Sequence, residues 1–250
     1  MNEADRALID ECRRARRDGG LAVLDGLHAL KHALRFHARI QSAWTRDRDG
    51  LIALARRLAP DIAEPLGALV EDVAADVFEA LAPKAPETGV IAIAERPGHQ
   101  AEEVAGRRRA PSVLLEDPAH LGNVGAVVRV AAAAGAAAVY TTGRHDPWDP
   151  AALRGSAGLH FALPVQRLDA IPDAAGPLIA IDPEGAPLRP EALPAHALLA
   201  FGSERRGLSH ALLDRADQRL SLPMQPNVSS LNLATAVAAV LYAWRFAVER

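Results

Sequence analysis

Short apolar runs alternate with helical patterns over the C-terminal half of this 250-residue chain. The runs "VLLED", "AAVYTTG", "ALLAFGSE" and "QRLSLPM" are typical of strands, and patterns such as "GAVVRVAAAAG", which ends at Gly135, and "LSHALLDRA" are typical of helices. This alternation predicts an α/β fold with a mainly parallel sheet over residues 113–250. A final helix is expected to place five large apolar residues on one face: Leu233, Val237, Val240, Leu241 and Trp244.

The N-terminal half repeats this alternation on a smaller scale. "LAVLDGLHALKHALRF" begins as a strand at Leu21–Leu24 and continues as a helix, "ALVEDVAADVFEALA" is amphipathic, and "GVIAIAE" is typical of a strand. Residues 96–112, "RPGHQAEEVAGRRRAPS", have no periodicity and are rich in charge, proline and glycine. We therefore expect a small α/β domain over 1–95, a linker over 96–112 and a larger domain over 113–250.

Composition excludes several classes of protein. Half of the residues are apolar, which argues against disorder, and the net charge of −3 argues against a strongly basic nucleic-acid binder without excluding one. The arginine clusters at 13–17 and 107–109 suit either phosphate recognition or a solvated surface. The single cysteine, Cys12, excludes an internal disulfide and a Cys-rich zinc site.

Two further features set the expected compartment. The acidic start "MNEADRALID" lacks the apolar core of a secretory signal. The longest uncharged run, from Leu220 to Trp244, is interrupted by Pro223 and Pro226, which leaves less than the roughly 20 apolar residues of a membrane-spanning helix. We expect a cytoplasmic protein without a membrane segment.

Polar, glycine-containing segments follow three of the predicted strands. They are "EDPAHLGNVGAVVR" at 116–129, "LLAFGSERRGLS" at 198–209 and "LSLPMQPNVSSLNLA" at 220–234. Because ligands bind at the carboxyl ends of strands in open α/β sheets, we expect the three segments to converge. Capping alone explains some of their polar residues, with Ser209 before one helix and Ser229 or Ser230 before the last. The third segment holds more polar groups than one cap needs, so Ser229 as the cap would leave Ser230 for a ligand.

Together the three segments resemble the motifs of the SpoU, or TrmH, family of RNA ribose methyltransferases in the SPOUT superfamily. The resemblance covers roughly residues 113–250, and "DPWDPAALRGSAG" at 146–158 also looks like the family. "LAVLDGLHALKHAL" is similar to the ribosomal-protein-like RNA-binding domain of many members. Arg205 departs from the pattern, since many members have a small residue there. The matching residues are Asn123-x-Gly125-x-x-x-Arg129, Gly202-Ser203-Glu204-x-x-Gly207-Leu208, Leu222-Pro223-Met224 and Ser229-Ser230-Leu231-Asn232.

The resemblance implies a C-terminal domain with a deep trefoil knot that binds S-adenosylmethionine. The backbone near Gly202, Leu222 and Leu231 is expected to enclose this cofactor. The implied reaction is methyl transfer to a ribose 2′-hydroxyl of RNA, with ribosomal RNA favoured over transfer RNA. Members are usually homodimers with the active site built across the interface, and the apolar last helix with Trp244 suits either that contact or the core. The N-terminal domain is not notably basic, since residues 1–110 hold 17 Lys and Arg against 18 Asp and Glu.

The resemblance also implies a set of catalytic residues, in which Arg129 has sometimes been given the role of general base. The pKa of arginine is about 12.5–13.8, so neutralising it at pH 7 costs on the order of 8 kcal/mol. We therefore expect Arg129 to hold a phosphate or stabilise the developing alkoxide, while Glu204 orients it or handles the proton through water. The implied catalytic residues are Asn123, Arg129, Glu204, Ser230 and Asn232.

Other interpretations stay open at this point. The chain could be a catalytically silent RNA-binding relative, although all five implied catalytic residues are present. A nicotinamide-dependent oxidoreductase is disfavoured because Gly122-x-x-Gly125 does not supply the G-x-G-x-x-G fingerprint. Asp25, His28 and His32 have the spacing of a metal-binding helix face, but no fourth ligand is evident, so we expect no metal. Trp148 could stack on a base or pack within its loop.

Overall fold

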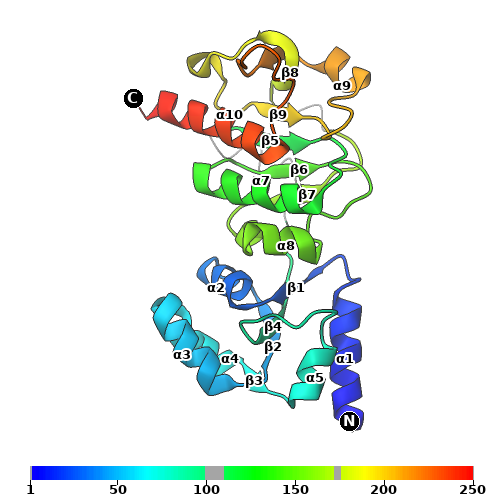
Figure 1. The fold of residues 1–250 in the computed structure, drawn as a ribbon, viewed down its shortest axis with the longest axis vertical. Helices are drawn as coiled ribbons and strands as arrows, with labels where there is room; N and C mark the ends of the chain where they lie inside the picture. Colours follow the sequence, from blue (N-terminus) through cyan, green and yellow to red (C-terminus); the bar gives the residue numbers. More distant parts are fainter. Residues whose placement is uncertain (1, 99–109, 172–175, 250) are drawn as a thin grey trace. The chain divides into compact units, whose positions relative to one another are not determined.

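The structure is a computed structural model that describes residues 2–98, 110–171 and 176–249. It divides into two compact units, one formed by Met1–Pro97 with Ala157–Ala162 and the other by Gly98–Ser156 with Leu163–Arg250. The elements of the N-terminal part (Figure 1) are α1 Glu3–Ala15, β1 Leu21–Asp25, α2 Leu27–Arg35, β2 Ile40–Thr45, α3 Arg48–Leu58, η1 Pro60–Ile62, α4 Ala63–Leu69, β3 Glu71–Asp72, α5 Ala75–Ala80 and β4 Val90–Glu95.

The N-terminal unit is built on a four-stranded sheet with the order β1-β4-β2-β3. Strand β4 runs antiparallel to both of its neighbours, and β2 runs parallel to β3. The predicted strand at Leu21–Leu24, the helix after it and the strand in "GVIAIAE" are all present. The amphipathic stretch at 68–82 is not one helix, because Glu71 and Asp72 pair with the end of β2 and separate α4 from α5.

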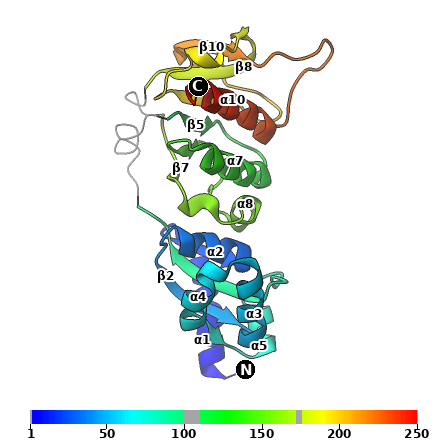
Figure 2. The same cartoon turned by 90° about the vertical axis from the view of Figure 1, so that its left-hand side faces the viewer.

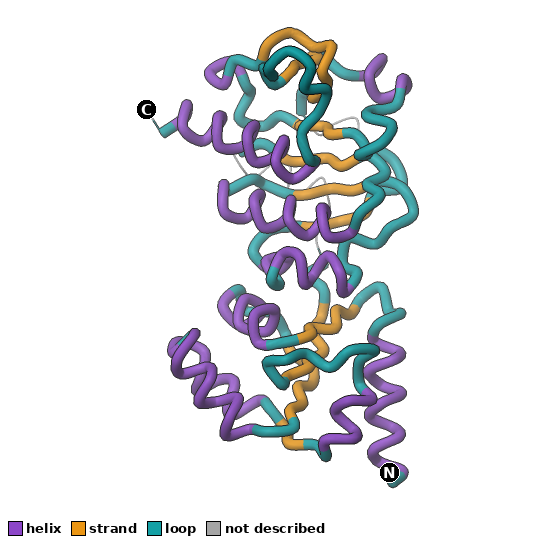
Figure 3. The backbone as a smooth tube through the Cα atoms, viewed as in Figure 1, coloured by secondary structure: helices purple, strands orange, loops and turns teal. Residues whose placement is uncertain are grey.

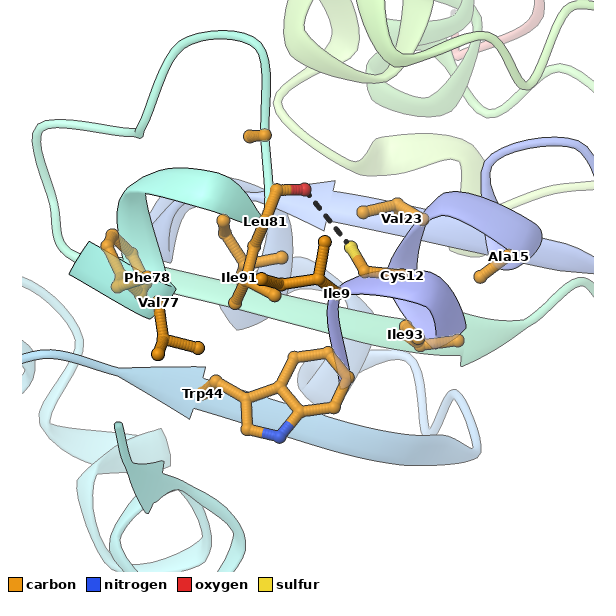
Figure 4. Close-up of a cluster of buried hydrophobic side chains, with 11 residues drawn as sticks. Ile9, Cys12, Ala15, Val23, Trp44, Val77, Phe78, Leu81, Ile91 and Ile93 are labelled. Carbon is orange, nitrogen blue, oxygen red and sulfur yellow. Dashed lines mark hydrogen bonds between the residues drawn. The ribbon is translucent and has the colours of Figure 1, made fainter. Parts of the chain in front are cut away.

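A cluster of buried side chains from α1, α5 and the sheet forms the core of this unit (Figure 4). Cys12 belongs to it, and its thiol donates a hydrogen bond of 3.3 Å to the carbonyl of Leu81. Burial raises the pKa of the Cys12 thiol, which keeps the sulfur protonated at neutral pH. The lone cysteine is therefore a packing residue.

The C-terminal unit is built on a six-stranded sheet with the order β10-β8-β9-β5-β6-β7, and all of its strand pairs are parallel. The prediction of an α/β fold with a mainly parallel sheet is therefore confirmed. Its elements are β5 Ser112–Leu115, α7 Leu121–Ala134, β6 Val139–Thr141, α8 Pro150–Ser156, β7 Val165–Arg167, β8 Leu178–Pro187, η3 Pro190–Ala192, β9 Leu198–Phe201, α9 His210–Arg215, β10 Gln218–Ser221 and α10 Leu233–Val248.

Both faces of the six-stranded sheet are covered, which explains why its strands are continuously apolar. On one face Leu114, Ala180 and Ala200 pack with Leu208 and Leu212 of the α9 region. On the other side α8, α7 and α10 lie next to one another (Figures 1 and 2). Figure 3 shows the alternation of strands and helices through this unit that the sequence predicted.

Helix α10 has one buried and one exposed apolar face. The five residues predicted to share a face are all buried, so Trp244 is a core residue. Tyr242, Phe246 and Val248 are exposed instead, with the rings of Tyr242 and Phe246 5.8 Å apart. No helix among the described residues is long and apolar enough to span a membrane.

The predicted linker can be described only at its two ends. Residues 99–109, including Arg107–Arg109, lie outside the described residues, and Ser112 already belongs to β5. Helix α7 ends as predicted, with Gly135 in the left-handed conformation at φ +77°.

Candidate active site

The three polar segments converge at the point where the sheet changes its winding direction. From β5 the chain runs through α7 to β6 on one side, whereas from β9 it runs through α9 toward β10 on the other. Strands β5 and β9 are adjacent and parallel, so their carboxyl ends lie together at this edge. Loops that separate at such a switch point leave a crevice between them, where α/β proteins bind ligands.

A chain of hydrogen bonds links one side chain from each segment. The Nδ2 of Asn123 donates to Oε1 of Glu204 over 2.7 Å, and the Nδ2 of Asn232 donates to Oδ1 of Asn123 over 3.2 Å. The other carboxylate oxygen of Glu204 accepts from the backbone N–H of Ala119 over 3.1 Å. The structure thus brings together three of the five candidate catalytic residues, of which Asn123 and Asn232 are 109 positions apart.

The groups at the two ends of this series of hydrogen bonds determine which side chain donates and which accepts at each step. An ionised carboxylate only accepts, so Asn123 must turn its amide nitrogen to Glu204 and its oxygen to Asn232. Asn232 must in turn present its own oxygen to the N-terminus of α10, where it accepts from the backbone N–H of Ala234 at 3.0 Å and of Thr235 at 3.4 Å. Each amide orientation is therefore determined by the next group along the chain.

The expected helix cap was wrong. Asn232 is the N-cap of α10, and neither Ser229 nor Ser230 holds that position. The helix begins at Leu233, two to three residues later than either serine would require, and Asn caps helices as well as Ser does. It is thus Asn232, rather than a serine, that combines a capping role with a role in the polar cluster.

Glu204 is ionised at neutral pH. Partial burial alone would raise the pKa of its carboxyl group. The hydrogen bonds from Asn123, from its own backbone N–H and from Ala119, together with the nearby His120, outweigh burial and lower that pKa. A carboxylate with a lowered pKa is a weak base. Glu204 is therefore better suited to orienting Asn123 than to taking a proton.

A cavity of about 340 Å³ opens beside this cluster. Gly202, Leu222 and Leu231 line it, and so do Glu204 and Ser230. Its size is in the range of small-molecule and cofactor sites, and its apolar walls with a few polar groups are typical of them. The residues expected near a cofactor therefore share one cavity with two of the candidate catalytic residues.

Two glycines shape the turn that carries Glu204. Ser203 and Gly207 exchange backbone hydrogen bonds of 3.1 and 3.0 Å, and Gly207 has φ +64°. A Cβ on Gly202 would lie 2.0 Å from the carbonyl carbon of Gly207, so no side chain fits there. Substituting Gly202 would open the turn and displace Glu204 from Asn123.

Arg129 is not joined to the cluster within one chain. It lies in α7 six residues after Asn123, about 9 Å along the helix axis, and its side chain is exposed. No hydrogen bond or ion pair links it to a residue that the structure describes, and the cavity lining does not include it.

One wall of the cavity was not predicted from the sequence. Ile181, Asp182 and Pro183, at the middle of β8, line it as well. The Oδ1 of Asp182 accepts from Nε and Nη2 of Arg219 at 2.8 and 2.6 Å, which fixes the carboxylate at the cavity wall. The signal was present in "PLIAIDPEG", an apolar run that ends in Asp-Pro, but this run was not recognised as a strand.

The structure gives an outcome for Trp148, which could stack on a base or pack within its loop. Trp148 is 6% exposed and its indole N–H donates to the carbonyl of Val165 over 2.9 Å, so it packs within its loop. The carboxylate of Asp25 pairs with Arg16 at 2.8 Å. Within the described ranges, no group of three His, Cys, Asp or Glu side chains is arranged to hold a metal ion.

Comparisons with known proteins give a consistent result. The sequence model of the SpoU rRNA Methylase family matches residues 110–242. A 23S rRNA (uridine(2479)-2′-O)-methyltransferase from Streptomyces viridochromogenes is 31% identical over 167 residues, which are 61% of this chain and 58% of that protein. The chain thus spans a little over half the length of that relative. An uncharacterised tRNA/rRNA methyltransferase from Mycobacterium bovis is 33% identical over 209 residues, 77% of this chain and 72% of that protein.

A solved structure resembles nearly the whole chain. The crystal structure of the SpoU methyltransferase AviRb from Streptomyces viridochromogenes, in complex with the cofactor AdoMet, is 25% identical with a TM-score of 0.77. The alignment covers 98% of this chain and 98% of that one, so both compact units have a counterpart there.

Proposed function

The chain belongs to the SpoU rRNA methylase family, and from this premise we propose that it transfers a methyl group from S-adenosylmethionine to a ribose 2′-hydroxyl of RNA. The observation that carries the proposal is the hydrogen-bonded chain of Glu204, Asn123 and Asn232 beside the cavity. Three loops that are distant in sequence meet at one edge of a parallel sheet, and each contributes one of the polar groups that match the family motifs.

The residues around the cavity fit S-adenosylmethionine. Gly202 lines the cavity at the β9 turn, and Leu222 and Leu231 supply apolar walls for a nucleoside. Asp182, held by Arg219, offers carboxylate oxygens to a ribose hydroxyl or an amino group. When bound, the cofactor supplies an electrophilic methyl group on a sulfonium.

The residues of this chain would position the attacking oxygen and stabilise the charge that develops on it. A ribose hydroxyl is a poor acid, so negative charge accumulates on its oxygen during attack. Asn123 is held in one orientation by Glu204 and Asn232, which gives a preorganised polar group at the cavity edge. Ser230 lines the same cavity and can hydrogen-bond the ribose or the cofactor.

We propose that Arg129 completes the site in a homodimer. Its side chain is exposed and remote from the cavity of its own chain, whereas a charge-stabilising role needs contact with the reacting ribose. Helix α10 packs beside α7, which carries Arg129, and exposes Tyr242 and Phe246. Exposed aromatic side chains of this kind are enriched in interfaces, so this surface suits contact with a second copy.

Subunit complementation tests the shared site. Arg129→Ala and Glu204→Gln are each expected to lower turnover strongly, but mixing them in equal amounts gives heterodimers in which one of the two sites has every residue intact. A two-fold symmetric dimer then recovers about a quarter of wild-type activity. If the mixture stays inactive although mixed dimers are demonstrated by mass spectrometry, Arg129 does not act on the partner's cavity.

The same proposal extends to the substrate and the compartment. We favour ribosomal over transfer RNA because the relatives with assigned ribosomal targets match longer segments of this chain than the tRNA enzyme does. The N-terminal domain that the sequence predicts over 1–95 would bind that RNA in the cytoplasm. The loops that line the cavity would belong to a trefoil knot. When the ends of the unfolded chain are pulled apart, that knot would tighten and the measured extension would be shorter than the full contour length.

Ribose-methylation mapping of total RNA, with and without the protein, tests the function. We expect one new ribose mark in ribosomal RNA, tritium transfer from labelled cofactor, and calorimetric binding of S-adenosylhomocysteine but not of NAD. Glu204→Gln provides the catalytic control. Binding of S-adenosylhomocysteine without transfer to any RNA would instead favour a catalytically silent relative.

A further inference from the structure

A second cavity, of about 430 Å³, lies next to the cofactor cavity and shares Ser203 and Arg205 with it. It is lined by residues of three loops, which follow β5, β6 and β9. We call it the arginine pocket. Its remaining lining residues are Asp117, Pro118, Ala119, Arg144, His145 and Arg206.

The arginine pocket has an excess of positive charge. Its one carboxylate, Asp117, pairs with Arg206. The Nε of Arg144 donates to Nε2 of His145 over 3.3 Å, which is a contact with a ring nitrogen and not with a carboxylate. Arg205 has no hydrogen bond or ion pair to any part of the chain that the structure describes. Among the described residues, no carboxylate pairs with the guanidinium group of Arg144 or with that of Arg205.

The loops that carry these arginines are closely packed against each other. Gly143 has φ +82°, and a Cβ there would lie 2.3 Å from Oδ1 of Asp117. The backbone N–H of Asp117 donates to Thr142 over 3.2 Å. On the opposite side, the two hydrogen bonds between Ser203 and Gly207 close the turn that carries Arg205. The arginine side chains are exposed, but their backbone positions are held by these contacts.

Glu204 connects the arginine pocket to the candidate active site. One of its carboxylate oxygens accepts from Ala119, in the wall of the arginine pocket, and the other accepts from Asn123. A group bound in the arginine pocket therefore lies next to whatever is bound at Asn123. In RNA every ribose is flanked by phosphodiester groups, so an anion site next to the candidate active site suits this polymer.

We propose that the arginine pocket binds a phosphodiester of the RNA next to the ribose that is methylated. Guanidinium forks match phosphate oxygens in geometry and in charge, and contacts to phosphates set the register of a protein on a nucleic acid. The proposal rests on the proposed function only for the identity of the anion as RNA. The cofactor carries a carboxylate that guanidinium groups would also bind, and the experiment separates these two sources.

The experiment compares Arg144→Ala, Arg205→Ala and Arg205→Lys with the wild type. Arg189→Ala is the matched control, since Arg189 is an exposed arginine of the same unit that lines neither cavity. A fluorescein-labelled single-stranded oligouridylate serves as the RNA probe, and its affinity is measured by anisotropy at several NaCl concentrations. The affinity for S-adenosylhomocysteine is measured by calorimetry on the same variants, and circular dichroism confirms that each is folded.

Each alanine variant in the pocket is expected to bind the oligouridylate about three- to tenfold more weakly. The slope of log affinity against log salt should fall by about 0.7 for each lost phosphate contact. Arg205→Lys should keep that slope because the charge stays, and Arg189→Ala should behave as the wild type. Binding of S-adenosylhomocysteine should stay unchanged in Arg144→Ala and Arg189→Ala, because neither residue lines the cofactor cavity.

Two results would overturn the proposal. An unchanged salt slope in both alanine variants would show that no phosphate binds in the pocket. A loss of affinity for S-adenosylhomocysteine, without change in the RNA slope, would assign the pocket to the cofactor carboxylate. Failure of the proposed function is a separate result. A wild-type chain that neither binds S-adenosylhomocysteine nor methylates RNA would refute that function, and the salt dependence of its affinity for the oligouridylate could still be measured.

Discussion

Replacing Asn232 tests whether one side chain both caps α10 and holds Asn123. Asn232→Ala removes the oxygen that accepts from the first turn of α10 and the nitrogen that donates to Asn123. Loss of a cap costs about 1 kcal/mol, and loss of a hydrogen bond at an accessible site costs about 1 kcal/mol more. For a unit of this size, about 2 kcal/mol lowers the melting temperature by roughly 4–8 °C.

Asn232→Asp separates the two roles. Aspartate caps helices as well as asparagine does and interacts favourably with the positive end of the helix dipole, so the cap survives. It has no N–H to offer, so one of its oxygens faces the Oδ1 of Asn123, and two acceptors oppose each other. We expect a fall in melting temperature of at most about half that of Asn232→Ala. Turnover should be strongly reduced in both variants, because Asn123 loses its fixed orientation.

Differential scanning calorimetry and single-turnover methylation measure the two effects. Ser229→Ala is the matched control in the same loop and should leave both the melting temperature and the turnover unchanged. If Ser229→Ala lowers the melting temperature as much as Asn232→Ala does, a serine caps the helix in solution. Equal destabilisation by Asn232→Asp and Asn232→Ala would show that capping contributes nothing measurable.

Three further substitutions test the roles of the remaining site residues. Glu204→Gln should lower turnover with little change in folding, because the new amide nitrogen must face a donor, either Asn123 or Ala119. In the wild type the pKa of Glu204 is lowered from its ordinary value of 4.5, so the hydrogen bonds to its carboxylate stabilise the fold above pH 4.5 and are lost only as the pH falls below that value. Wild-type melting curves should therefore be insensitive to Glu204 between about pH 6 and 9. Ser230→Ala should damage turnover more than stability, whereas unchanged turnover with a lower melting temperature would reverse its assignment. Arg129→Lys should lower the rate by loss of the guanidinium fork without moving the pH profile, and a retained rate with a strongly shifted acid limb would favour the role of general base.

The alternation of strands and helices could largely be predicted from local patterns. Continuous apolar runs such as Leu198–Phe201 and the glycine after α7 are determined by local physics, so several strands, the end of α7 and the parallel sheet followed from the sequence. The amphipathic stretch at 68–82 could not be predicted in this way. Its interruption depends on pairing of Glu71 and Asp72 with β2, which is a tertiary contact that local periodicity does not contain.

The sequence predicted that the loops carrying Asn123, Glu204 and Asn232 converge, but not the contacts that each side chain makes. Capping preferences alone cannot choose among Ser229, Ser230 and Asn232, because all three residue types cap well. What selects Asn232 is its second hydrogen bond, to Asn123, more than 100 positions earlier in the chain. The wall supplied by Asp182 was missed for a similar reason, since β8 reaches the cavity only through its position between β9 and β10 in the sheet.

The strand order explains why these loops, and no others, meet. Strands β5 and β9 are neighbours whose following segments leave in opposite directions, so their loops face each other across the switch point, and Asn123 reaches Glu204 there. The loop after β10 starts two strands away from β9 and must cross the end of β8 before α10 returns to pack against α7. Asn232 is the N-cap at which α10 begins, and it also contacts Asn123. The position at which the helix starts therefore also determines the geometry of the site. A change that shifts the first turn of α10 should therefore disturb Asn123 even when no residue of the cavity is altered.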